Sequence, residues 1–162
     1  MKTVLKIAIV GAFALTGTAV VAQDATLGLD GPMRQVFAAP AAVAYMTPPV
    51  DDGTLKRTWT WLFLKDAIPA GADTLALEWE IDCAARTSRT VRTVLYAGAT
   101  HVKTDAGAAE RTAPAAGTPA AITLDAACAP PERARTTPVT NAAAARAAAN
   151  ALFAAPAPAG RR

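Results

Sequence analysis

The stretch "TLALEWEIDCAARTSRTVRTVLYAG", residues 74–98, contains the clearest strand pattern in the chain. Its first ten residues alternate between two sides: one side has Leu75, Leu77, Trp79, Ile81 and Cys83, and the other has Ala76, Glu78, Glu80 and Asp82. This period of two is typical of a strand with one buried face. A second run, 90–97, is rich in β-branched and aromatic residues and follows after a short connection. The two runs predict neighbouring antiparallel strands, because parallel neighbours need a long crossover.

Similar patterns occur on both sides of this pair. Residues 58–65 alternate with Trp59, Trp61 and Phe63 on one side, and shorter strand-like runs lie at 41–46 and 99–103. Residues 120–128 also alternate, with Ile122, Leu124, Ala126 and Cys128 in phase, and are expected to form a further strand. Turn-forming groups such as 51–53 separate these runs. The pattern predicts an α+β, mainly β fold: a single antiparallel, meander-like sheet of about five to six strands.

The carboxy-terminal part of the chain has a different composition. Three prolines lie between residues 129 and 138, and an alanine-rich run follows Asn141. Because alanine has the highest intrinsic helix propensity and asparagine is a good N-cap, residues 142–154 are expected to form a helix. A disordered tail is expected after Pro156.

The first 22 residues have the pattern of a secretory signal peptide. Lys2 and Lys6 precede an apolar run, 7–21, which ends in small residues before Gln23. The alternative, an uncleaved membrane anchor, is disfavoured because the run is short and weakly flanked. No cysteine follows the run, so a lipoprotein is not expected. The pattern predicts export to the periplasm or to the cell surface and extracellular space, with no membrane span after signal cleavage.

These patterns divide the chain into six segments. They are a signal peptide (1–22), a flexible N-terminal segment (23–34), a β domain (35–128), a Pro-containing linker (129–140), an Ala-rich helix (141–155) and a disordered tail (156–162).

Export changes the charge of the working protein. The full chain has 16 basic and 13 acidic residues, and removal of Lys2 and Lys6 leaves 14 basic residues against 13 acidic ones, a net charge of +1. Because nucleic-acid binding requires a concentrated basic stripe, we expect no nucleic-acid partner.

The two cysteines are expected to form a disulfide. Cys83 and Cys128 are each in phase with the apolar side of a predicted strand, and disulfides persist outside the cytoplasm. A catalytic thiol would need a nearby base, whereas the only histidine, His101, lies in a polar run. Two separate buried thiols are the remaining alternative. We expect no enzyme, no catalytic residue, no cofactor and no metal site, since no recognisable constellation of such residues occurs.

Arg86, Arg89 and Arg92 are candidates for binding a partner. Their spacing of three alternates the faces of a strand, so Arg89 shares a side with the other two only if a turn or a bulge intervenes. The alternative, which the sequence favours, is cross-strand pairing with the acidic side of residues 78–82.

The order of these features resembles the surface-adhesin protein E-like family of small exported bacterial domains. The residues that carry the resemblance lie between about 35 and 128: Trp59-Thr60-Trp61-Leu62-Phe63, then Glu80-Ile81-Asp82-Cys83 with Arg86 and Arg89, then Tyr96, Pro114-Ala115-Ala116-Gly117-Thr118 and Cys128. The resemblance implies an antiparallel sheet with an intramolecular disulfide, exposure in the cell envelope and adhesion to host proteins.

The resulting hypothesis is an exported, non-catalytic cell-envelope protein. It would be adhesin-like and would bind a protein partner, from the host or from the envelope, through its disulfide-clamped β domain. The alternative is a soluble periplasmic accessory or inhibitor domain with no role in surface adhesion. The sequence predicts neither the identity of the partner nor the oligomeric state.

Overall fold

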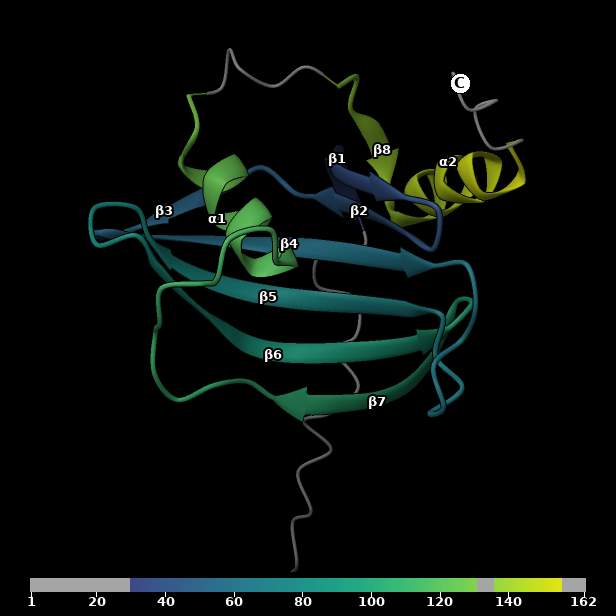
Figure 1. Cartoon of the computed structure of the whole chain (residues 1–162), viewed down its shortest axis with the longest axis horizontal. Helices are drawn as coiled ribbons and strands as arrows, with labels where there is room; N and C mark the ends of the chain where they lie inside the picture. Colours follow the sequence, from purple (N-terminus) through teal and green to yellow (C-terminus); the bar gives the residue numbers. More distant parts are fainter. Residues whose placement is uncertain (1–29, 131–135, 156–162) are drawn as a thin grey trace, which may run out of the picture.

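The structure, a computed structural model, describes residues 30–130 and 136–155. It contains one antiparallel sheet of eight strands and two helices (Figure 1). The prediction of a mainly β fold with a single antiparallel sheet is confirmed, but the sheet has more strands than the five to six expected. The predicted signal peptide (1–22) and tail (156–162) lie outside the described residues.

The elements follow one another along the chain as strands with two late helices. They are β1 (Asp30–Ala39), β2 (Ala42–Met46), β3 (Val50–Asp52), β4 (Leu55–Leu64), β5 (Thr74–Asp82), β6 (Thr87–Ala97), β7 (Thr100–Ala106), α1 (Pro119–Cys128), β8 (Val139–Asn141) and α2 (Ala142–Ala154). The sheet order is β7-β6-β5-β4-β2-β1-β8, and the short β3 pairs with β4. Strands β4 to β7 therefore form the meander that their alternating patterns and short connections predict.

The first half of β1 and most of β8 lie in segments that are expected from the sequence to lack regular structure. β1 begins at Asp30, inside the segment 23–34 predicted to be flexible, and β8 lies at the end of the predicted linker, 129–140. The two strands pair with each other across about a hundred residues of chain. Arg34 Nη1 also donates to the Thr136 carbonyl at 2.6 Å, and the Thr136 hydroxyl donates to the Gln35 carbonyl at 3.1 Å. β8 and the start of β1 are strands because these distant segments supply each other's hydrogen-bond partners, whereas residues 34–39 of β1 pair with the neighbouring β2.

The prediction of a strand at residues 120–128 is wrong, because this segment forms α1. The Thr118 side chain accepts a hydrogen bond from the Ala121 N–H, and Pro119 occupies the first turn. Both are helix-start features, since proline at the first position lacks only an N–H that the helix leaves unpaired. The buried residues Thr123, Leu124 and Ala127 follow helical spacing rather than alternation.

The helix expected at residues 142–154 is confirmed as α2. Asn141 Oδ1 caps it by accepting from the Ala144 N–H at 2.9 Å. Ala145 and Ala149 are fully buried against the sheet. Their small side chains let the helix backbone approach the sheet closely.

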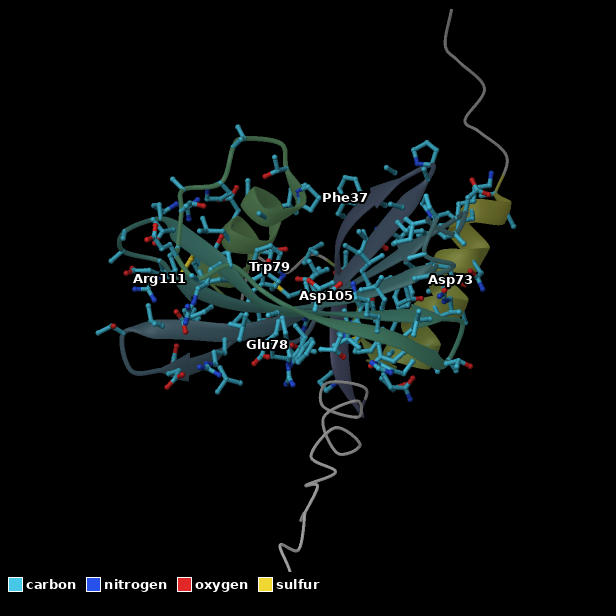
Figure 2. All side chains as sticks on the ribbon, turned by 90° about the horizontal axis from the view of Figure 1, so that it is seen from below. Phe37, Asp73, Glu78, Trp79, Asp105 and Arg111 are labelled. Atoms are coloured by element: carbon cyan, nitrogen blue, oxygen red, sulfur yellow. A yellow bond between two sulfur atoms is a disulfide. The ribbon has the colours of Figure 1, made fainter. Side chains whose placement is uncertain are left out.

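An arginine on α2 fixes this helix to the end of the sheet. Arg146 contacts the side chains of Asp73 and Thr74, and its guanidinium lies 5.0 Å from the centre of the Phe63 ring. Burial would raise the pKa of Asp73, but hydrogen bonds from the Gly98 N–H, Thr74 and Arg146 outweigh it and lower this pKa. Figure 2 shows Asp73 beside α2.

The two helices cover opposite faces of the sheet. On the α1 face, Trp79 and Ile81 pack with Leu124 and Ala127 of α1. The other face, which we call the α2 face, has the following residues packed with the alanines of α2: Met33, Val43, Tyr45, Trp61, Phe63, Ala76, Val94 and Tyr96. Figure 2 shows Trp79 and its chain neighbour Glu78 on opposite sides of β5. Trp61 and Trp79 are therefore core residues on different faces.

The predicted disulfide between Cys83 and Cys128 is present. The sulfur atoms are 2.02 Å apart and the Cα atoms 5.6 Å apart. Cys83 follows β5 on the α1 face, as its phase predicted, whereas Cys128 is the last residue of α1 rather than part of a strand. The disulfide therefore attaches the end of α1 to the connection between β5 and β6.

Candidate functional site

Charged side chains gather on the α2 face, at the end of the sheet away from Phe63 and α2. We call this cluster the arginine face, and it consists of Arg57, Arg89, Arg92 and Arg111 with Glu78, Glu80 and Trp59. Three neighbouring strands, β4, β5 and β6, and the segment after β7 contribute to it.

A bulge in β6 places two of the arginines on the same side. Glu78 is opposite Arg92 and Glu80 is opposite Arg89, although the glutamates are two residues apart and the arginines three. The register shifts between Glu78 and Trp79, so β6 carries one extra residue, Val91. The condition under which Arg89 and Arg92 can share a side is therefore met.

Glu80 lies at the centre of the cluster. Its side chain is only 7% exposed and accepts two hydrogen bonds from Arg89, from Nε and Nη2, both at 3.1 Å. Arg111 Nη1 donates to Glu80 Oε1 at 2.5 Å, and Arg57 Nη2 lies 3.8 Å from Oε2. The hydrogen bond from Arg89 contributes most to lowering the pKa of Glu80; burial acts against it, and Arg111 adds to the lowering.

Glu78 forms a second pair beside the first. It accepts a hydrogen bond from Arg92 Nε at 2.7 Å, and Arg57 Nη1 lies 3.7 Å away. The guanidinium of Arg92 lies 5.0 Å from the centre of the half-buried Trp59 ring, which is a cation–π distance. Arg57 also pairs with Asp52 of β3 at 2.8 Å.

The segment after β7 brings Arg111 to the cluster. The N–H groups of Gly107 and Ala108 donate to the carbonyls of Val91 and Thr90, each at 2.9 Å, and Ser88 and Thr112 exchange two hydrogen bonds at 3.0 Å. Residues 107–112 therefore run along the start of β6 and across its bulge. Figure 2 shows Arg111 at the end of the sheet opposite to Asp73.

Arg86 does not join Arg89 and Arg92. It lies in the connection between β5 and β6, with φ at +56°, and pairs with Asp125 of α1. Arg86 thus attaches α1, close to the disulfide, on the α1 face. Of the three candidate arginines, the structure brings two together.

Two functional candidates, Arg57 and Arg111, were missed by the sequence reasoning. Arg57 is in phase with Trp59 and Trp61, so its position on this face was readable from the alternation of β4. Arg111 had no such signal, because it lies outside every strand and its place depends on the hydrogen bonds of residues 107–112.

The cluster has more positive than negative charge. Four guanidinium groups surround the buried Glu80 and the partly buried Glu78, while Asp52 pairs with Arg57. The most exposed of the arginines are Arg57, with 47% of its side chain accessible, and Arg111, with 37%. The predicted cross-strand pairing is therefore present, and it leaves an excess of positive charge at the surface. Guanidinium forks in fixed positions are suited to binding anions. In the described part of the chain, no group of three or more His, Cys, Asp or Glu is placed to hold a metal ion.

An apolar groove of about 290 Å³ lies on the α1 face. Phe37, Leu62, Leu75 and Leu77 line it together with residues at the start of α1. It carries no charged side chain and is separate from the arginine face.

Acid should destabilise the protein partly through Glu80. Because the folded-state pKa of Glu80 is lowered, its stabilising effect is complete above its ordinary pKa of 4.5 and is lost as the pH falls through the folded value. Glu80→Gln should reduce the free energy of unfolding at pH 7 by about 1–3 kcal/mol, less than a fully buried pair because the arginines are partly exposed. Urea unfolding between pH 7 and pH 3 measures this, and the difference between variant and wild type should shrink as the pH falls.

The matched control is Glu110→Gln, which removes an exposed carboxylate nearby. It should change the free energy of unfolding by no more than about 0.5 kcal/mol. A constant difference between Glu80→Gln and the wild type over the whole pH range would contradict the role of the ionised carboxylate.

Comparison of the chain with protein-family models, with curated proteins and with solved structures found no match. In the described part of the chain, neither helix is long and apolar enough to cross a membrane. The likeness to the surface-adhesin protein E-like family therefore remains a prediction from the residues that carry it.

Proposed function

We propose that this protein is an exported, non-catalytic, adhesin-like protein of the cell envelope that binds a protein partner through the arginine face. The observation that supports this most directly is the excess of fixed arginines beside the half-buried Trp59. Arginine and tryptophan, together with tyrosine, are enriched among the residues that dominate the energy of protein interfaces.

The glutamates favour binding by holding the arginines in place. Arg89 and Arg92 are already oriented by Glu80 and Glu78, so a partner would lose less side-chain entropy when it contacts them than with mobile arginines. The Cys83–Cys128 disulfide is compatible with export, because such bonds persist in oxidising compartments.

The location of the domain separates the proposal from its alternative. An adhesin-like protein must be exposed at the cell exterior, whereas a periplasmic accessory or inhibitor domain lies behind the outer membrane. Lys103 is a suitable reporter, since its side chain is 61% exposed on the edge strand β7.

The experiment is to treat intact cells with a membrane-impermeant amine reagent and to measure labelling of Lys103 by mass spectrometry. We expect Lys103 to be labelled on intact cells while a periplasmic marker protein stays unlabelled. Labelling that appears only after the outer membrane is permeabilised would overturn the surface role and support the periplasmic alternative.

A further inference from the structure

We infer that the arginine face recognises an acidic segment of its protein partner, through carboxylate side chains that bind to Arg57 and Arg111. This inference rests on the proposed function and specifies the chemistry of the partner. Three features support it: Arg57 and Arg111 have N–H donors that are not used within the cluster, the positive charge is confined to this part of the surface, and the patch has the width of a short extended segment.

The two outermost arginines have donors to spare. A guanidinium group has five N–H donors. Among the described residues, Arg111 donates from Nη1 to Glu80, and Arg57 uses Nε toward Asp52 while its other nitrogens lie 3.7–3.8 Å from the glutamates, beyond normal hydrogen-bond length. Both side chains are more than one third exposed, so a carboxylate from a partner can reach them.

The cluster itself shows which anion it suits. Glu80 is already held by Arg89 through two parallel hydrogen bonds and by Arg111 through a third. Planar guanidinium forks match planar carboxylates in this way. A carboxylate from a partner would repeat the same contact on the outer edges of Arg57 and Arg111.

The positive charge is local, which favours a short acidic segment over a long polyanion. Beyond residue 22 the chain has a net charge of only +1, so the excess on this face is balanced by acidic residues elsewhere. The cluster extends across β4, β5 and β6 to residues 107–112. At about 4.8 Å between neighbouring strands, this is a patch of roughly 15 Å, which about five residues of extended chain can span.

The test uses a fluorescently labelled ten-residue peptide of alternating glutamate and threonine, and the same peptide with glutamine in place of glutamate. Binding to the chain without residues 1–22 is measured by fluorescence polarisation at about 50 and 200 mM salt, a range over which the screening of exposed charges increases. We expect the acidic peptide to bind, more weakly at the higher salt, and the glutamine peptide not to bind.

Two variants locate the binding. The double variant Arg57→Gln/Arg111→Gln should weaken binding about tenfold, because two exposed ion pairs are lost. The double variant Lys65→Gln/Lys103→Gln removes the same charge away from the cluster and should change affinity less than about twofold. A third variant, Arg57→Lys/Arg111→Lys, keeps the positive charge but loses the planar, two-donor guanidinium group. Its affinity for the peptide should lie between those of the first two variants.

Three results would overturn the inference, and the first is that the acidic peptide does not bind. Equal losses in the first two variants would mean that the peptide senses only net charge, and a heparin fragment that binds more tightly than the acidic peptide would assign the face to sulfated chains. The inference and the proposed function fail separately. Surface labelling of Lys103 without peptide binding would leave the surface role and remove the acidic partner, whereas peptide binding by a protein confined to the periplasm would remove the surface role and leave the acidic partner.

Discussion

Replacing Gly107 by alanine should destabilise the protein by about 2–4 kcal/mol and displace Arg111 from Glu80. A Cβ at this position would lie 1.7 Å from the Thr90 carbonyl oxygen and 2.6 Å from the Val91 carbonyl carbon. Both are backbone atoms of the β6 bulge and cannot rotate aside. The segment that begins at Gly107 must therefore separate from β6.

That separation would affect the surface as well as the stability. The hydrogen bonds from Gly107 and Ala108 to β6 hold the segment in which Arg111 lies. Urea unfolding measures the stability, and peptide binding measures the surface. We expect Gly107→Ala to lose affinity for the acidic peptide at temperatures where the sheet is still folded.

Gly31→Ala is the matched control for this substitution. A Cβ at Gly31, in β1, would meet nothing within 4 Å. Its free energy of unfolding should stay within about 0.5 kcal/mol of the wild-type value. If the two alanine variants were equally stable, the close approach of residue 107 to the bulge would not hold in solution.

Removal of the disulfide should reduce the free energy of unfolding by about 4 kcal/mol, since it closes a loop of 45 residues in the unfolded chain. The variant is Cys83→Ala/Cys128→Ala, and for a domain of this size the expected fall in Tm is roughly 10–20 °C. Because the bond attaches the end of α1, hydrogen exchange in α1 should accelerate more than exchange in β5.

The wild-type protein under reducing conditions is the control for this variant. Its Tm should fall by a similar amount, whereas without reductant the denatured wild type should show no thiol that a maleimide can label, since both cysteines are paired. An unchanged Tm in the double variant would mean that the packing of Leu124 and Ala127 holds α1 without the bond.

Strand β5 contributes to the core on one face and to the candidate site on the other. On the α1 face, side chains of β5 such as Trp79 and Ile81 are covered by a helix. On the α2 face, the same strand presents Glu78 and Glu80, which form ion pairs with four arginines and so hold them in one cluster. The mobile ends of long side chains are thereby held in one arrangement before any partner arrives.

The sequence by itself determined the elements whose signals are local. The alternation of residues 74–83 predicts β5, since side chains of a strand point to opposite faces. The alanine run after Asn141 predicts α2 and its cap. The phase of Cys83 on the apolar side, in a chain predicted to be exported, predicts the disulfide.

The tertiary structure decided what depends on partners far away in the chain. Residues 120–128 fit both periods, and the cap of Thr118 with the packing of Leu124 made them a helix. β8 became a strand, and β1 extends back to Asp30, because these two distant segments pair with each other, whereas the rest of β1 pairs with the neighbouring β2. The extra residue Val91 placed Arg89 and Arg92 on the same side. Position 107 has no room for a Cβ beside that bulge, so a glycine there lets the segment 107–112 approach β6 and bring Arg111 to the other arginines. The alternation of a sequence predicts on which side of its own strand a residue lies. The register between strands, the positions of bulges and the place of segments such as 107–112 depend on pairing with other strands.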